Sequence, residues 1–229
     1  MTLFDQIQTA RENIQKTLDS AKINNTVTLV AATKTQNIKT IEKCINGGIL
    51  HIGENRVQEA IAKFKNTRIE RNTCTKRMIG HLQSNKINKA LSFFDTIDSI
   101  DTLSLAKKIS TKSEAKKIKI QTMLEVNTSQ EQNKFGFKPE DDQAMLETIE
   151  LKNINVVGLM TLGPINKKPK ETELSFKSLR KIKENLNKHL PGNKQLKELS
   201  MGMSGDYELA IHQGSTMVRL GTALFGKRV

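Results

Sequence analysis

The sequence predicts an α/β fold: a single closed (β/α)8 barrel of the TIM type. Eight short apolar runs, each typical of a buried strand, alternate with segments whose apolar residues repeat at helical spacing. The length of 229 residues suits such a barrel. The alternative is an open doubly wound sheet, but the first strand lacks the G-x-G-x-x-G turn that a dinucleotide-binding sheet carries there.

An amphipathic helix is expected before the barrel, over residues 2–20. Thr2 and Asp5 resemble the capping signature S/T-x-x-E, with aspartate in the last place. The apolar residues of the segment fall on one stripe of a helix, at Leu3, Ile7, Ala10, Ile14 and Leu18.

The strands and helices of the barrel are expected to alternate along the rest of the chain. The strands are predicted at residues 27–33, 49–53, 77–80, 93–98, 118–126, 155–161, 198–203 and 216–221. The helices are predicted at residues 37–46, 54–65, 85–91, 102–110, 139–150, 171–190 and 205–213. Ser84, Asp101 and Ser204 are candidate N-caps, and Gly47-Gly48 is a helix stop. Nothing suggests a linker, so residues 1–229 are expected to form one domain.

The net charge of +13 raises the question of a nucleic-acid partner. The lysines are scattered over predicted helix faces, no nucleic-acid-binding motif is present, and one Tyr with no Trp leaves little surface for base stacking. We therefore do not expect a nucleic-acid partner, although a basic nucleic-acid-binding protein remains an alternative.

Other classes of protein are disfavoured by the composition. No stretch approaches the ~20 apolar residues of a membrane span, and the first residues do not resemble a signal peptide. Cys44 and Cys74 suggest neither a disulfide framework nor a metal cluster, and the four histidines lack metal-ligand spacing. We expect a cytoplasmic protein without a metal or a membrane partner.

A lysine follows the first predicted strand, in "VTLVAATKTQ" at residues 27–36. Active groups of a barrel gather at the carboxyl ends of its strands, which is where Lys34 falls. Its side chain has three explanations: it reaches solvent, it pairs with an acid such as Glu54, or it forms an imine with a carbonyl compound.

The last two strands suggest a phosphate site. Ser204 falls where a helix is predicted to start, and Gly221 and Thr222 follow the eighth strand. Arg219 has the parity of Gly221 and would face the same ligand. Ordinary capping, a plain turn and a structural ion pair are the simpler explanations. A phosphate site beside an imine-forming lysine suggests pyridoxal 5′-phosphate (PLP).

Five motifs in order resemble the YggS/PROSC family of PLP homeostasis proteins. They are "VAATKT" at 30–35, "HIGENRVQEA" at 51–60, "RMIGHLQSNK" at 77–86, "GLMTLGP" at 158–164, and "LSMGMSGD" with "GSTMVRLGTALFG" within 199–226. The family's N-x-S-G-E-E-S-K-x-G-F loop stands here as "NTSQEQNKFGF" at 127–137. Its first glycine is missing, which leaves the conformation of the loop open.

The resemblance implies a fold-type III PLP barrel, similar to the N-terminal domain of alanine racemase without its second, β-rich domain. It implies a Schiff base at Lys34, Asn55 near the cofactor, and Arg219 at the pyridine nitrogen. Ser204, Gly221 and Thr222 look like phosphate contacts. The implied role is intracellular binding, safe storage and delivery of PLP by a monomer, with apo-enzymes that need PLP as candidate recipients and with no turnover.

A low-activity PLP-dependent amino-acid racemase is the alternative enzyme. Racemisation needs two bases, one on each face of the substrate. Lys34 supplies one, but the single tyrosine, Tyr207, is expected to be a helix-surface or packing residue. His81 is a conceivable second base, and a surface or capping role is the simpler expectation for it. An arginine at the pyridine nitrogen also disfavours a protonated ring, so we expect a binding protein.

Overall fold

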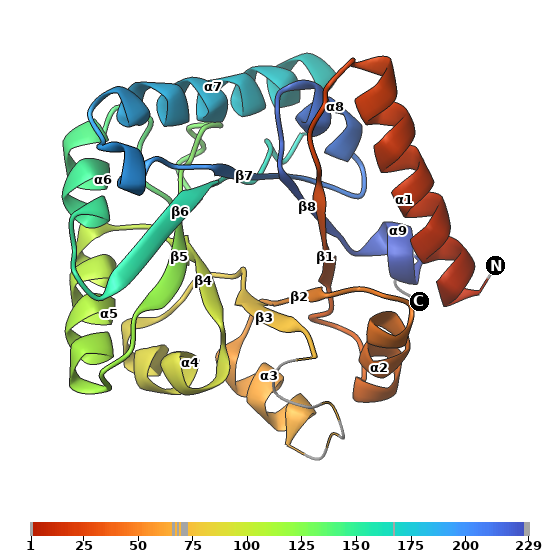
Figure 1. The fold of residues 1–229 in the computed structure, drawn as a ribbon, viewed down its shortest axis with the longest axis horizontal. Helices are drawn as coiled ribbons and strands as arrows, with labels where there is room; N and C mark the ends of the chain where they lie inside the picture. Colours follow the sequence, from red (N-terminus) through yellow and green to blue (C-terminus); the bar gives the residue numbers. More distant parts are fainter. Residues whose placement is uncertain (1, 66, 68, 70–72, 167, 227–229) are drawn as a thin grey trace.

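The computed structural model describes residues 2–65, 67, 69, 73–166 and 168–226. Its centre is a closed barrel in which every strand pairs in parallel with the next and β8 pairs with β1 (Figure 1). The strands are β1 (Thr28–Ala32), β2 (His51–Glu54), β3 (Thr75–Met78), β4 (Thr96–Ile100), β5 (Ile120–Glu125), β6 (Ile154–Met160), β7 (Glu198–Met203) and β8 (Met217–Leu220). The predicted barrel is confirmed, and the open sheet is wrong.

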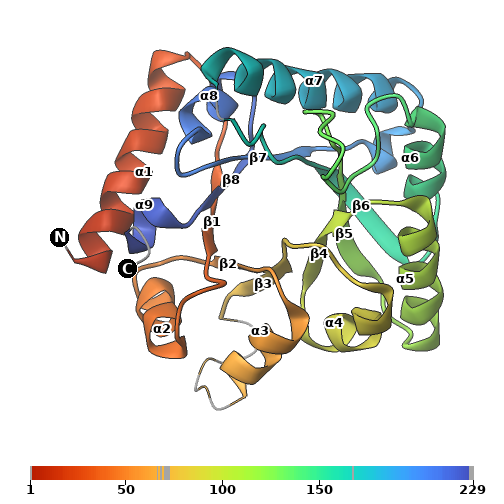
Figure 2. The same ribbon diagram turned by 180° about the vertical axis from the view of Figure 1, so that it is seen from behind.

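Helices surround the barrel and connect its strands, as both faces in Figures 1 and 2 show. They are α1 (Leu3–Ser20), α2 (Ile38–Asn46), α3 (Val57–Phe64), α4 (Ile87–Phe93), α5 (Leu103–Ala115), α6 (Asp142–Ile149), α7 (Pro169–Lys188), α8 (Tyr207–His212) and α9 (Thr222–Phe225). Two short 3-10 turns, η1 (Ser84–Lys86) and η2 (Gly192–Lys194), precede α4 and β7.

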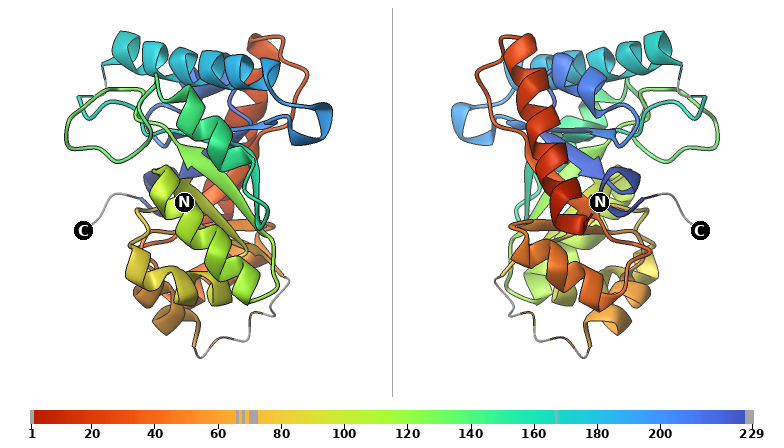
Figure 3. Two further views of the ribbon diagram at one scale, coloured as in Figure 1. Left: turned by 90° about the vertical axis from the view of Figure 1, so that its left-hand side faces the viewer. Right: turned by 90° about the vertical axis from the view of Figure 1, so that its right-hand side faces the viewer.

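The N-terminal helix α1 lies along the outside of the barrel, beside α8 and α9 (Figure 3). The predicted capping box is present: Asp5 N donates to Thr2 Oγ1 at 3.2 Å, and Thr2 N donates to Asp5 Oδ2 at 2.7 Å. The expected helix stop is also present, because α2 ends before Gly47 and Gly48 takes a positive φ of 83°. The sequence therefore sets both helix boundaries locally.

Apolar residues are buried in two places. Two large clusters lie between the strands and the helices, where residues such as Phe176 and Ile7 are fully buried. A smaller cluster, made of strand residues only, lies inside the barrel: Val30, Met123, Met160 and Met217. Because Arg219 is two residues after Met217, it points to the same interior side of β8.

Three local predictions need correction. The strand expected at 93–98 begins only at Thr96, because Phe93 ends α4 and packs edge-on against Phe94. Ser84 does not cap a helix but opens η1. Thr102, not Asp101, caps α5, and its Oγ1 accepts a hydrogen bond from Leu105 N. Only in the last case does a neighbouring residue form the predicted capping contact.

Within the described part of the chain, no helix combines the length and the apolar character that crossing a membrane requires.

Candidate functional site

A cavity of about 570 Å³ opens at the carboxyl ends of β1, β7 and β8. Its volume suits a small organic ligand. Five of the six predicted site residues line it: Lys34, Ser204, Arg219, Gly221 and Thr222. The remaining wall comes from Ala32, Thr35, Gln36, Met203, Gly205, Asp206, Phe225 and Gly226. The end of the barrel therefore brings an amine, a guanidinium and a set of short polar groups together.

Lys34 stands in the turn that directly follows β1, and its side chain is exposed in the cavity. No described residue forms a hydrogen bond or an ion pair with its ammonium group. Pairing with Glu54, one of the explanations considered from the sequence, is wrong: the Glu54 carboxylate lies 2.6 Å from Lys63 Nζ. The Lys34 amine is accordingly free to meet a ligand.

Arg219 is buried inside the barrel and held by three acceptors. Its Nη1 donates to Ser200 O at 2.8 Å and Ser200 Oγ at 2.6 Å, and its Nη2 donates to Thr161 O at 2.7 Å. A guanidinium has five N–H groups, so Nε–H and one Nη2–H are left over. Burial lowers the pKa of Arg219, and the Glu125 carboxyl opposes that shift. Arg219 is thus a fixed cation with donors to spare, not half of a simple ion pair.

Ser204 links β7 to the turn after β8. It does not cap α8, whose N-cap is Asp206; its Oγ accepts hydrogen bonds from Gly221 N at 3.1 Å and Ala223 N at 3.0 Å. Gly221 precedes the single helical turn α9, where the sequence indicated only a glycine turn. Among the described residues, the N–H of Thr222 has no partner. The Ser204 hydroxyl hydrogen and this N–H are therefore two donors that a ligand could use.

Asn55 lies apart from this group, in a neighbouring cavity of about 460 Å³ that His81 also lines. His81 is exposed, as the surface role predicted, but it also has specific partners. Its Nδ1 lies 2.7 Å from Asp101 Oδ2, and its ring stacks on Phe135 with centroids 3.7 Å apart. Tyr207 is buried against the outer core, which confirms its packing role. The two residues considered as a second base therefore do not line the Lys34 cavity.

Glu125, at the end of β5, is a buried carboxyl that the sequence did not single out. Burial raises its pKa to about 7, against the opposing effects of Arg219 and Lys134. Its only signal in the sequence is an acidic residue closing an apolar strand. Among the residues that the structure describes, no group of three or more His, Cys, Asp or Glu is arranged to hold a metal ion.

Comparison with known proteins decides the family. Residues 6–229 match the model of the alanine racemase N-terminal domain. A pyridoxal phosphate homeostasis protein of Aquifex aeolicus is 35% identical over 230 residues, which is 100% of this chain and 99% of the relative. The human pyridoxal phosphate homeostasis protein is 34% identical and aligns over 87% of this chain and 76% of its own length.

The chain belongs to the pyridoxal phosphate homeostasis protein family. A solved relative, PipY of Synechococcus elongatus with PLP bound, is 31% identical with a TM-score of 0.85, covering 98% of this chain and 100% of that one. Alanine racemase of Clostridium difficile matches at 16% identity and a TM-score of 0.73, over 95% of this chain and 56% of that chain. The latter shows a shared fold only.

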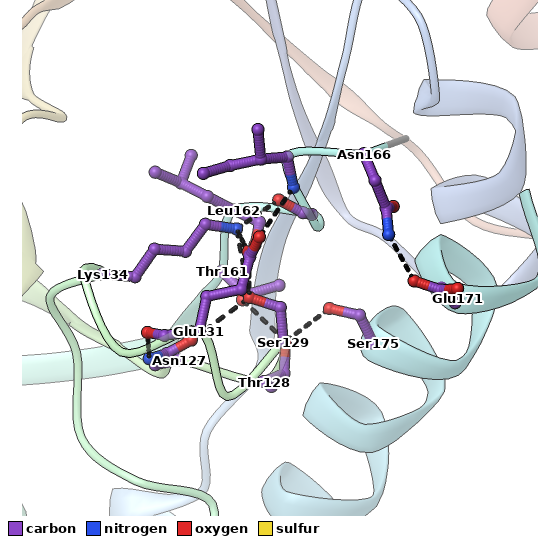
Figure 4. Close-up of polar contacts among 12 residues, drawn as sticks. Asn127, Thr128, Ser129, Glu131, Lys134, Thr161, Leu162, Asn166, Glu171 and Ser175 are labelled. Carbon is purple, nitrogen blue, oxygen red and sulfur yellow. Dashed lines mark hydrogen bonds and ion pairs between the residues drawn. The ribbon is translucent and has the colours of Figure 1, made fainter. Parts of the chain in front are cut away.

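The loop at 127–137, where this chain departs from the family pattern, is held by polar contacts (Figure 4). Lys134 Nζ donates to Gly163 O at 2.7 Å, pairs with Glu131, and donates to Ser129 Oγ at 3.0 Å. Thr128 Oγ1 lies 2.8 Å from Thr161 Oγ1. Because Thr161 O is also an acceptor for Arg219, the loop helps to fix the residue that lines the cavity.

The missing glycine of this loop has a visible consequence. Gln130 stands where the family pattern has glycine, and it takes the left-handed φ of 54°. A residue with a Cβ is strained in this region, whereas glycine is not. The chain keeps the backbone conformation that a glycine would adopt without strain, and the strain at Gln130 lowers its stability.

Replacing Gln130 by glycine is expected to raise the free energy of unfolding by about 1 kcal/mol, because the left-handed strain disappears. Urea unfolding of the wild type, Gln130→Gly and Gln130→Ala measures the effect. Alanine keeps the Cβ and is expected to give no gain. A glycine variant no more stable than the alanine variant would contradict the strain at this position.

Proposed function

We propose that this chain binds PLP in the cavity beside Lys34, through a covalent bond to the Lys34 amine, and acts in PLP homeostasis by holding and delivering the cofactor. The observation that carries the proposal is the convergence of Lys34, Arg219, Ser204 and the Gly221-Thr222 turn on one cavity. The names of the relatives and the PLP in PipY agree with it.

The chemistry of the cavity fits PLP at three points. When bound, PLP supplies an aldehyde that condenses with a primary amine, and Lys34 offers that amine without a competing partner. The Ser204 hydroxyl and the Thr222 N–H suit a phosphate group, which accepts hydrogen bonds. The remaining N–H groups of Arg219 suit the pyridine nitrogen, and Ala32, Met203 and Phe225 offer apolar surface.

Arg219 also favours storage over catalysis. A guanidinium stays protonated at physiological pH, so at the ring nitrogen it donates a hydrogen bond and the nitrogen holds no proton of its own. An unprotonated ring withdraws electrons weakly, which disfavours reactions that build negative charge on a substrate. Binding and exchange of amines do not need that charge.

We infer that PLP-requiring apo-enzymes receive the cofactor and that the chain acts as a monomer in the cytoplasm. The family resemblance supports both the recipients and the monomer. Cys44 and Cys74 are free and buried, in keeping with a reducing compartment. Asn55, in the neighbouring cavity, is proposed to border the bound cofactor at its edge.

Lys34→Ala is expected to abolish covalent attachment of PLP, because Lys34 supplies the one side-chain amine among the described residues that line the cavity. The protein is mixed with PLP, reduced with borohydride and digested, and the modified peptide is identified by mass spectrometry. The exposed Lys39 of α2, which does not line the cavity, is the matched control. Lys39→Ala is expected to behave as the wild type.

A wild type that carries reduced PLP on the Lys34 peptide, with none there in Lys34→Ala, supports the proposal. A wild type that shows no absorption band for bound PLP and no modified peptide would contradict the proposed PLP binding.

A further inference from the structure

Thr33, the residue before Lys34, is anchored at every polar group it has. Its N–H donates to Gly53 O at 2.9 Å, and its Oγ1 donates to Glu54 Oε1 at 2.6 Å. Its carbonyl oxygen accepts from Lys63 Nζ at 2.9 Å and from Gln36 N at 2.8 Å. The peptide that leads into Lys34 is therefore tied to β2, to α3 and to its own turn.

The anchor is an ion pair that is largely buried. Lys63 Nζ lies 2.6 Å from Glu54 Oε1, and the two side chains are 13% and 2% exposed. One Glu54 oxygen thus accepts from both Lys63 and Thr33. Such a pair costs desolvation, and a surface position would be cheaper for Lys63. The pair contacts Thr33, the residue before Lys34, and this position indicates a role beyond stability.

The contacts act on Lys34 through the peptide plane. The carbonyl of Thr33 and the N–H of Lys34 belong to one rigid planar unit. Two donors hold the carbonyl oxygen, so the direction in which the Lys34 chain leaves the strand is held as well. A lysine stem has four flexible carbons, and a fixed origin narrows the positions that its amine can reach.

We propose that Glu54 and Lys63 form a largely buried positioning pair that holds the Thr33–Lys34 peptide and thereby prolongs the lifetime of the covalent bond between Lys34 and PLP. The inference rests on the proposed function and adds what regulates it: the retention of the cofactor depends on a lysine that never touches it. Water breaks the bond and returns the PLP aldehyde and the free Lys34 amine, and the two re-form it with release of water. Without the pair, the amine spends less time where the bond re-forms, and PLP leaves sooner.

The test compares Lys63→Met, which removes the charge, with Lys63→Arg, which keeps a cationic donor. Lys107→Met is the matched control, because Lys107 makes an exposed pair with Glu147 at the similar distance of 2.7 Å.

Each protein is loaded with PLP and chased with 4′-deoxypyridoxine phosphate, an analogue without an aldehyde. The release rate is followed by absorbance. The fraction of bound PLP that borohydride fixes to Lys34 is the second readout, and the Tm without ligand is the third.

Lys63→Met is expected to release PLP about tenfold faster and to show a smaller fixed fraction, because the amine is misplaced. Lys63→Arg is expected to keep a release rate and a fixed fraction close to those of the wild type. Lys107→Met is expected to match the wild type in both. A lower Tm in Lys63→Met with an unchanged release rate and fixed fraction would overturn the inference, since a purely structural pair acts in that way.

Thr33→Val covers the case in which Lys63→Met does not fold. It removes the hydroxyl that donates to Glu54, which is one of the two contacts by which the pair holds Thr33, so faster release is expected from it as well. Unchanged release in Thr33→Val would then overturn the inference. Failure of the proposed function is a separate outcome in the same experiment, because the wild type would carry no PLP on Lys34.

Discussion

Asp98→Asn is expected to lower the free energy of unfolding by about 3–5 kcal/mol, the usual cost of leaving one half of a buried ion pair. Asp98 Oδ2 accepts from Arg77 Nε at 2.6 Å, and Oδ1 accepts from Arg77 Nη2 at 3.1 Å and from Thr96 Oγ1 at 2.8 Å. Both charged side chains are at most 2% exposed. Asparagine keeps the shape but leaves the Arg77 charge without a counter-ion inside the protein.

Urea unfolding at neutral pH measures this loss, and two controls locate its origin. Glu59→Gln breaks the exposed Arg56–Glu59 pair, in which Arg56 Nη1 lies 2.7 Å from Glu59 Oε1, and is expected to lower the free energy of unfolding by under about 1 kcal/mol. The double variant Arg77→Met with Asp98→Leu is expected to recover most of the loss, because neither charge of the pair remains. A loss below about 1 kcal/mol in Asp98→Asn would show that water reaches the pair and screens it.

Glu125→Gln is expected to remove a pH dependence worth about 3 kcal/mol from the stability of the protein without ligand. The pKa of Glu125 rises from 4.5 to about 7 on folding, because burial outweighs the nearby cations Arg219 and Lys134, while Asp101 adds to the rise. Between these two pH values the folded protein keeps a proton that the unfolded chain has released. Stability therefore falls as the pH rises through this window, and the total is about 3 kcal/mol.

Urea unfolding of the wild type and Glu125→Gln at pH 5 and pH 8, at one ionic strength, tests this sign and size. Relative to the wild type, the free energy of unfolding of Glu125→Gln is expected to be higher at pH 8 than at pH 5, since glutamine has no proton to lose. Glu147→Gln, at an exposed pair, is expected to keep the wild-type difference between the two pH values. A wild type whose stability relative to Glu125→Gln is the same at both pH values would contradict a buried, proton-holding Glu125.

The barrel and most of its boundaries could be predicted from the sequence, because they depend on local patterns. Apolar runs separated by helical periodicity predicted the strand order, and Thr2 with Asp5 predicted a capping box that is present. Parallel strands end on the same side of a barrel, so the sequence also predicted that Lys34, Ser204 and Arg219 lie close together. All three line one cavity.

Contacts between residues far apart in the chain were decided only by the tertiary structure. The sequence offered Glu54 as a partner for Lys34, but packing of α3 on β2 brings Lys63 to Glu54 and leaves Lys34 free. Ser204 precedes a helix as caps do, yet its hydroxyl accepts from Gly221 and Ala223 because β7 and β8 are neighbours.

The same limit applies to charge and strain. The pKa of Glu125 depends on its burial, which no local pattern records. The left-handed φ of Gln130 follows from the network that holds the loop against Gly163 and Thr161, not from the preference of glutamine. The sequence by itself determined the order of the elements and the types of groups at their ends; three-dimensional packing decided which of those groups meet, because hydrogen bonds and desolvation depend on distance in space.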